Sequence, residues 1–236
     1  MRRLTVCGAV VAVVTVFGAS AALAGQGDLK KFCKTAVAID NAGEEGPSEK
    51  QLQRFRDTAP PDIADQVDQA VTTFEEQGEA AFEDDAFIAL ITEIDVFTVD
   101  NCGFEQLVVS MRDYAFDGVP GEIEKGTVAF NLTNEGTELH EMHFIRLKGD
   151  ATLEDILELP ADAEEHEFEE FGSEVAGGGF AFPGDSDVAL VKFKKTGTYV
   201  ALCSIPVGST PEAGDEGGSG PPHYTEGMAA EFEVTS

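Results

Sequence analysis

Hydrophobic residues follow a helical spacing through residues 25–106. Four apolar residues of one stretch recur every three or four positions and would share one face of a helix: Ile63, Val67, Val71 and Phe74. Ser48 suits the N-cap of one helix, and Pro61 with Asp62 suits the start of the next. Gly78 then interrupts the pattern. We expect three or four short helices in this region, with the apolar face packed in a core.

From residue 107 the pattern changes to short alternating segments separated by turns. Turn signals occur at Asp117–Gly118, Lys125–Gly126 and Asn134–Gly136, and β-rich segments lie between and after them. This pattern of short strands and turns is typical of an antiparallel sandwich. The predicted fold class is therefore α+β, with a small helical domain at 25–106 followed by a β-sandwich at 107–236.

Two segments interrupt the predicted sandwich. An acidic insertion occupies about residues 150–183, and within it Thr152 and Asp155 resemble a capping box that opens a short helix through Leu159. Residues 207–222 consist mostly of Gly, Ser, Pro and acidic residues, which predicts a long solvated loop outside any site.

The N-terminal segment has the form of a secretory signal peptide. Arg2 and Arg3 precede an apolar run, and Ala22-Leu23-Ala24 offers a small-residue cleavage site. We expect residues 1–24 to be a signal peptide and the protein to be secreted or extracytoplasmic, at the periplasm or cell surface. The alternative is an uncleaved segment that tethers the protein to a membrane.

The formal net charge of -30 argues against one class of partner and favours another. A surface this acidic repels nucleic acid, so DNA and RNA are not expected partners. The same surface attracts proteins that carry a basic docking patch.

The cysteine count indicates one disulfide and one metal ligand. Cleavage would leave Cys33, Cys102 and Cys203, and two of them should pair in an oxidising compartment. Cys33 lies in the first predicted helix and Cys102 just after the last, so a bridge between them would close the helical domain. Cys203 is then left over, and metal ligation would account for an exported thiol that stays unpaired.

Cys203 ends a predicted strand in which Tyr199 and Ala201 share its face. The loop that follows returns to "PPHYTEGM", which carries His223 and Met228. A thiolate, imidazoles and a thioether together select copper, and two histidines with a cysteine and a weak axial methionine form the blue-copper site. One further histidine is therefore required upstream.

His140 and His143 are the candidates for that upstream ligand, and on a strand they face opposite sides. We favour His140, because it follows the Asn134–Gly136 turn and alternates with Met142 and Phe144. His143 remains the alternative. A zinc-protease site is not expected here. Its helical motif places two residues between the glutamate and the second histidine, whereas His-Glu-Met-His has one and lies in a predicted strand.

Three stretches, "NEGTELHEMHF", "GTYVALCSIP" and "PPHYTEGM", resemble in this order the metal-binding elements of the cupredoxins, the plastocyanin-like blue copper proteins. The resemblance covers about residues 107–236 and implies a Greek-key β-sandwich that binds one type 1 copper ion. It also implies that His140, Cys203, His223 and Met228 are the ligands. The nineteen residues between Cys203 and His223 are a departure, since the family places only a few there. Loop closure costs entropy that grows slowly with length, so the ligand set survives the insertion.

The resemblance implies a one-electron carrier that works with a redox partner protein. The alternatives are an extracytoplasmic copper-handling protein without redox turnover, and a binding module that kept only the fold. An enzyme is not expected, because copper oxidases and reductases need several further histidines. Outside the four ligands this chain has only His143 and His166, and His166 lies in an acidic, solvated stretch.

Overall fold

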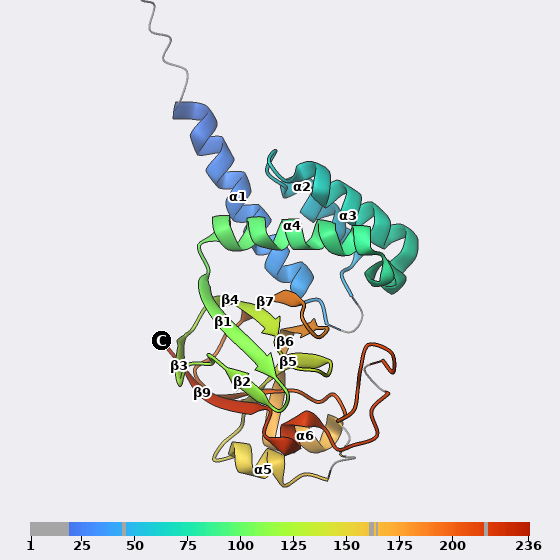
Figure 1. Cartoon of the computed structure of the whole chain (residues 1–236). Helices are drawn as coiled ribbons and strands as arrows, with labels where there is room; N and C mark the ends of the chain where they lie inside the picture. The colour runs from blue at the N-terminus through green and yellow to red at the C-terminus, as the bar shows by residue number, and fades with distance from the viewer. Residues whose placement is uncertain (1–18, 44–45, 161–162, 164, 215–216) are drawn as a thin grey trace, which may run out of the picture.

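The computed structural model describes residues 19–43, 46–160, 163, 165–214 and 217–236. The N-terminal helices lie at one end of the molecule and cover a β-sandwich, and two shorter helices lie at its opposite end (Figure 1). Most of the expected signal peptide, residues 1–18, lies outside the described residues, and the first helix begins at Ala19. No helix in the described part of the chain is long and apolar enough to cross a membrane.

The N-terminal region is helical, as the sequence predicts. It contains α1 (Ala19–Asp40), α2 (Glu49–Thr58), α3 (Ala64–Gln77), the 3-10 turn η1 (Gly78–Glu83) and α4 (Asp85–Cys102). Ser48 is the N-cap of α2, and its backbone N–H donates to the side chain of Gln51 at 3.1 Å. Ile63, Val67 and Val71 are buried in the helical core, which confirms the predicted apolar face.

The predicted disulfide is present. Cys33 in α1 is bonded to Cys102, the last residue of α4, with their Cα atoms 5.6 Å apart. The bridge therefore joins the first and last helices of the region, and Cys203 is the free, buried cysteine among the described residues.

Within the described ranges, nine strands form two sheets: β1 (Glu105–Arg112), β2 (Ala115–Asp117), β3 (Glu122–Glu124), β4 (Thr127–Asn134), β5 (His140–Leu147), β6 (Gly172–Ala181), β7 (Ser186–Lys192), β8 (Gly197–Leu202) and β9 (Ala229–Thr235). The first described sheet has the order β2-β1-β4-β7, and the second has the order β3-β9-β8-β5-β6. The expected sandwich is confirmed, but the prediction that its strands are all antiparallel is wrong. β1 pairs with β4 and β3 pairs with β9 in parallel, because the chain crosses between the sheets before each partner strand is laid down.

The sandwich presents three apolar layers. Between the sheets lies the main core, which includes Phe130 of β4 and Phe144 of β5. On the outer face of the first sheet, Ala129 and Leu190 pack against the helices. On the outer face of the second sheet, residues such as Val200 pack against two short helices, α5 (Leu153–Leu157) and α6 (Glu165–Phe171). Each sheet is thus covered on both faces, and the helical region serves as the cover of the first (Figure 1).

Part of the predicted acidic insertion belongs to the β-sandwich itself. Thr152 caps α5 in a capping box with Asp155, as expected. The glycine-rich stretch that follows α6, however, is β6, which pairs with β5 at the edge of the second sheet. The sequence pattern missed this strand because a run of glycines carries no side chains that could alternate.

Candidate metal centre

β8 delivers Cys203 to the end of the inter-sheet core. Tyr199 and Ala201 face that core, while Val200 and Leu202 face the opposite side, as the predicted alternation requires. Cys203 follows β8 directly, and its side chain is completely buried. The sheet therefore holds one sulfur atom in a fixed, dry position.

His140 is the first residue of β5, and a buried asparagine shapes the turn before it. The Asn134 side chain donates to the carbonyl oxygens of Glu138 and Ala181 at 2.8 and 2.9 Å, and accepts the N–H of Gly136 at 2.8 Å. A Cβ atom on Gly136 would lie 2.6 Å from His140 Nε2, so only glycine fits there. The turn thus brings the backbone close against the imidazole.

The C-terminal stretch forms the 3-10 turn η2 (His223–Glu226), followed by Gly227 in the left-handed region with φ of +118°. The turn carries the chain back over Cys203. The Met228 N–H donates to the His223 carbonyl at 3.0 Å, and the Cys203 N–H donates to the Met228 carbonyl at 3.2 Å. Both His223 and Met228 are completely buried. Cys203, His223 and Met228 are therefore tied together by main-chain hydrogen bonds.

Two imidazoles and one thiol converge between these elements. The Nδ1 atoms of His140 and His223 are 3.1 Å apart, and Cys203 Sγ lies 3.3 Å from His223 Nδ1. One potential ligand atom from each of the three residues lies within 4.8 Å of the other two, and all three side chains are buried. Two imidazole nitrogens and one sulfur, with a buried methionine beside them, are the donor set of blue copper.

This is the donor set of a type 1 copper site.

The sequence has no match among protein-family models and none among curated proteins. Among solved structures, a reduced auracyanin from the photosynthetic bacterium Roseiflexus castenholzii is 19% identical, with a TM-score of 0.36, over 56% of this chain and 97% of its own. Auracyanin A, a "blue" copper protein from Chloroflexus aurantiacus, is 17% identical over 55% and 99% of the two chains, with a TM-score of 0.32. Reduced rusticyanin is 18% identical over 55% and 78%, with a TM-score of 0.31, and multicopper oxidases also match. Likenesses this distant carry no argument about the chemistry of this chain, which rests on the copper site itself.

His143, the alternative upstream candidate, lies outside the copper site. It is on the other face of β5, and its Nε2 lies 2.7 Å from the hydroxyl of Ser204. His166 belongs to α6 by its backbone, and its side chain lies outside the described residues. Among the described residues, the structure therefore brings together the histidines that the strand alternation and the C-terminal motif predict.

The protonation of the copper site favours metal binding by His140. Burial first, and then the neighbouring His223, lower the pKa of His140, so its imidazole is neutral near pH 7. With Nε2–H donated to Asp113, the Nδ1 lone pair is left for the metal. Burial raises the pKa of the Cys203 thiol to about 12, so the thiolate forms when a metal ion replaces its proton.

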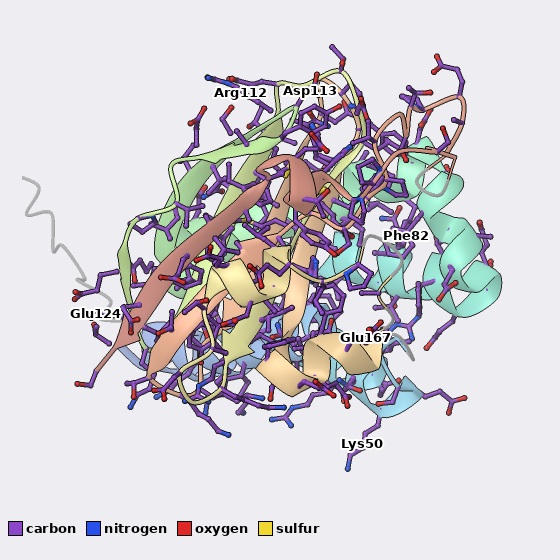
Figure 2. All side chains as sticks on the ribbon, turned by 90° about the horizontal axis from the view of Figure 1, so that it is seen from below. Lys50, Phe82, Arg112, Asp113, Glu124 and Glu167 are labelled. Carbon is purple, nitrogen blue, oxygen red and sulfur yellow. A yellow bond between two sulfur atoms is a disulfide. The ribbon has the colours of Figure 1, made fainter. Side chains whose placement is uncertain are left out.

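Two carboxylates that the sequence analysis did not identify orient the two histidines. His140 Nε2 lies 3.2 Å from Asp113 Oδ1, and His223 Nε2 lies 3.1 Å from Glu138 Oε2. Asp113 is at the outer edge of the sandwich (Figure 2) and is one-third exposed, whereas Glu138 is mostly enclosed. Carboxylates that accept the distal N–H of a ligating histidine fix its tautomer and ring orientation.

Hydrogen bonds hold both carboxylates in their ionised form. Burial would raise the pKa of Asp113, but hydrogen bonds from Thr137 and other donors outweigh it and lower that pKa. Burial likewise opposes ionisation of Glu138, and hydrogen bonds from the Gly208 N–H, His223 and Tyr114 together lower its pKa. Tyr114 also packs its ring edge-on against the His223 ring, with centroids 5.2 Å apart. The only sequence signal for Glu138 is its place two residues before His140.

The long loop between Cys203 and His223 supplies contacts to the residues around the two histidines. The prediction that the whole loop is solvated is therefore wrong. The Gly208 N–H donates to Glu138 Oε2, and the carbonyl of Ser209 accepts the N–H of Leu139 at 3.0 Å. Ser209 is completely buried. The start of the loop therefore packs beside the copper site, because Glu138 and Leu139 present polar groups that need partners there.

His140→Ala is expected to lose both the visible colour and most of the bound copper, because it removes one of the two imidazoles of the site. His143→Ala should keep both, since His143 contacts Ser204 rather than Cys203. Copper content by elemental analysis and the visible spectrum report the two quantities. Loss of the site in His143→Ala alone would contradict the arrangement described above.

Glu138→Gln is expected to weaken copper binding by about 10-fold or more, because the charged acceptor of the His223 N–H is lost. The neighbouring Glu135→Gln is the matched control, since Glu135 is exposed and pairs with Arg112 instead. Competition against a copper chelator measures both affinities. Equal affinities for the two variants would show that Glu138 does not orient His223.

Proposed function

We propose that this protein is an exported one-electron carrier that binds a single type 1 copper ion. The ligands are His140, Cys203 and His223, with Met228 as the weak axial donor. The observation that carries the proposal is the convergence of three buried donor side chains within 4.8 Å. Bound copper would supply a one-electron couple at this position.

The protein contributes a rigid and dry ligand set. Cys203 and His140 come from neighbouring strands of one sheet, and His223 returns on a turn bonded to Cys203 by its backbone. Asp113 and Glu138 restrain the two imidazoles through hydrogen bonds at their Nε2 atoms. Such preorganisation lowers the reorganisation that each electron transfer would otherwise require, because the ligands have little freedom to move.

Export and the redox partner belong to the same proposal. The Cys33–Cys102 disulfide supports an oxidising compartment such as the periplasm or cell surface. The net charge of -30 supports a redox partner protein with a basic docking patch, because opposite charges speed association. We propose no catalytic turnover: among the described residues, the copper site is the one cluster of His, Cys, Asp and Glu that could hold a metal ion.

Copper handling without redox turnover is the second candidate. The observation that favours it is the loop between Cys203 and His223, which is nineteen residues long and in its described part exposes Gly208, Glu212 and Gly217. A long loop permits the His223 side of the site to open, which suits an ion that must be released.

Titration of the metal-free protein with Cu(II) separates these functions. The electron carrier predicts one copper per chain, an intense visible band and a reversible one-electron couple in voltammetry. Copper binding with a weak band and no reversible couple would support handling instead. Absence of copper binding would leave a binding module and end the proposal.

Met228→Leu is expected to keep copper and raise the reduction potential, because loss of a weak axial donor destabilises Cu(II) relative to Cu(I). Met111→Leu is the matched control, since Met111 is equally buried in β1 and belongs to the general core. Voltammetry on both variants measures the shift. An unchanged potential in Met228→Leu would remove Met228 from the ligand set.

A further inference from the structure

A second candidate site lies between the helical region and the first sheet. A cavity of about 460 Å³ opens there, in the size range of pockets that hold small molecules. Its walls are mainly apolar and aromatic and include Leu52, Phe55, Phe74, Phe82, Phe87 and Ile91. Phe82, labelled in Figure 2, is 55% exposed although it lines the cavity, so it stands where the cavity meets solvent.

Four carboxylates line this apolar space: Glu79 of η1, and three aspartates from three other elements. Asp40 is the last residue of α1, Asp95 lies in α4 and Asp187 lies in β7. Asp40 accepts the N–H of Leu190 at 2.5 Å, and Asp187 accepts the N–H of Phe180 at 2.9 Å. Asp95 has no hydrogen-bond or ion-pair partner in the described structure. No Lys, Arg or His from the described residues lines the cavity.

Placing these carboxylates together beside apolar walls is energetically unfavourable unless a positive charge is nearby. Asp95 and Asp187 are partly buried, whereas Asp40 lies where the cavity meets solvent. Burial, with repulsion from Asp40 and Asp187, raises the pKa of Asp95 well above its usual range. Burial likewise raises the pKa of Asp187. Backbone hydrogen bonds stabilise the ionised forms of Asp40 and Asp187. Asp95 has no such bond, so it would be stabilised by protonation or by a positively charged ligand.

We propose that the cavity binds an organic ammonium ion with an apolar body. The ammonium group would pair with Asp95, the carboxylate that lacks any partner in the described structure. The apolar body would lie against the phenylalanine and leucine walls, where aromatic faces also attract cations. An ammonium ion with an apolar body would match both features of the cavity, the carboxyl group of Asp95 that lacks a partner and the apolar lining.

An inorganic cation fits less well. The three aspartates do not bring their oxygens within the distance of one another that a shared metal ion needs, whereas the described copper ligands do. A bare ion would also leave the aromatic walls without a contact. None of the four candidate copper ligands lines the cavity, so this proposal does not rest on the proposed function.

Calorimetric titration of the full chain with three probes tests the proposal. Hexylammonium chloride carries both the charge and the apolar body, 1-hexanol carries only the body, and methylammonium chloride carries only the charge. Hexylammonium should bind about 10-fold or more tightly than either of the other probes, because only it makes both kinds of contact.

Two variants on the same helix locate the binding. Asp95→Asn should weaken hexylammonium binding by about 10-fold or more, because it removes the unpaired charge. Asp100→Asn removes the same charge from an exposed position of α4 and should leave the affinity unchanged, which controls for general attraction to an acidic protein. Asp95→Asn should also unfold at a higher temperature than wild type without ligand, which confirms that it folds.

Several results would overturn the proposal. They are equal affinity of wild type and Asp95→Asn, 1-hexanol binding as tightly as hexylammonium, methylammonium binding as tightly as hexylammonium, or no binding of hexylammonium at all. If Asp95→Asn fails to fold, Asp40→Asn replaces it in the same titration. Its amide oxygen can still accept the N–H of Leu190, and hexylammonium affinity equal to that of wild type would again reject the site.

Discussion

Cys203→Ser is expected to abolish the intense visible absorption of the copper-loaded protein completely. The absorption of a blue copper site depends on a copper–thiolate bond, and a serine hydroxyl cannot supply a thiolate. Cys203 is the free cysteine among the described residues, so no other thiol there can take its place. The visible spectrum after addition of one equivalent of Cu(II) measures the loss, and electron paramagnetic resonance shows whether any remaining copper has changed its coordination.

Ser204→Ala is the matched control for this variant. Ser204 adjoins Cys203 in the chain, but its hydroxyl contacts His143 on the other side of the sheet. The control should keep its colour. A Cys203→Ser protein that stays intensely coloured would contradict the site and the proposed function together, whereas loss of colour in both variants would indicate a general disturbance at the end of β8.

Removal of the disulfide with Cys33→Ala and Cys102→Ala is expected to lower the free energy of unfolding by about 4 kcal/mol, on the chain-entropy estimate for a loop of this size. The bridge spans a sequence separation of 69 residues, so it restricts a long segment of the unfolded chain. It also ties α1 to the end of α4, immediately before β1 begins. Denaturant unfolding of the metal-free protein under non-reducing conditions measures the change.

The single variant Cys33→Ala is the control for loss of the side chain. It breaks the same bridge but leaves Cys102 in place, so it should lose nearly as much stability as the double variant. The copper site should keep its spectrum in both, because its ligands lie in the sandwich. A loss below about 1 kcal/mol in the double variant would show that native-state strain offsets the entropic gain of the bridge.

The local patterns of the sequence determined much of the candidate copper site. Strand alternation placed Cys203 on the core face of β8 and separated His140 from His143, because side chains on a strand point alternately to opposite sides. Cysteine parity predicted the disulfide. The spacing from His223 to Met228, with glycine before the methionine, predicted the tight turn that returns over Cys203. Each of these inferences needs only neighbouring residues or a count.

The tertiary structure alone decided which distant groups meet. Asp113 lies 27 residues from His140 in the chain and supports its imidazole only because the β1–β2 turn folds against the start of β5. Parallel pairing of β1 with β4, and the glycine-rich strand β6, likewise depend on how the chain crosses between sheets. The aspartates of the cavity converge from α1, α4 and β7. The spacing of residues within one segment cannot predict these contacts. They depend on how distant segments pack against one another, and the residues involved carry no distinctive pattern in their own segments.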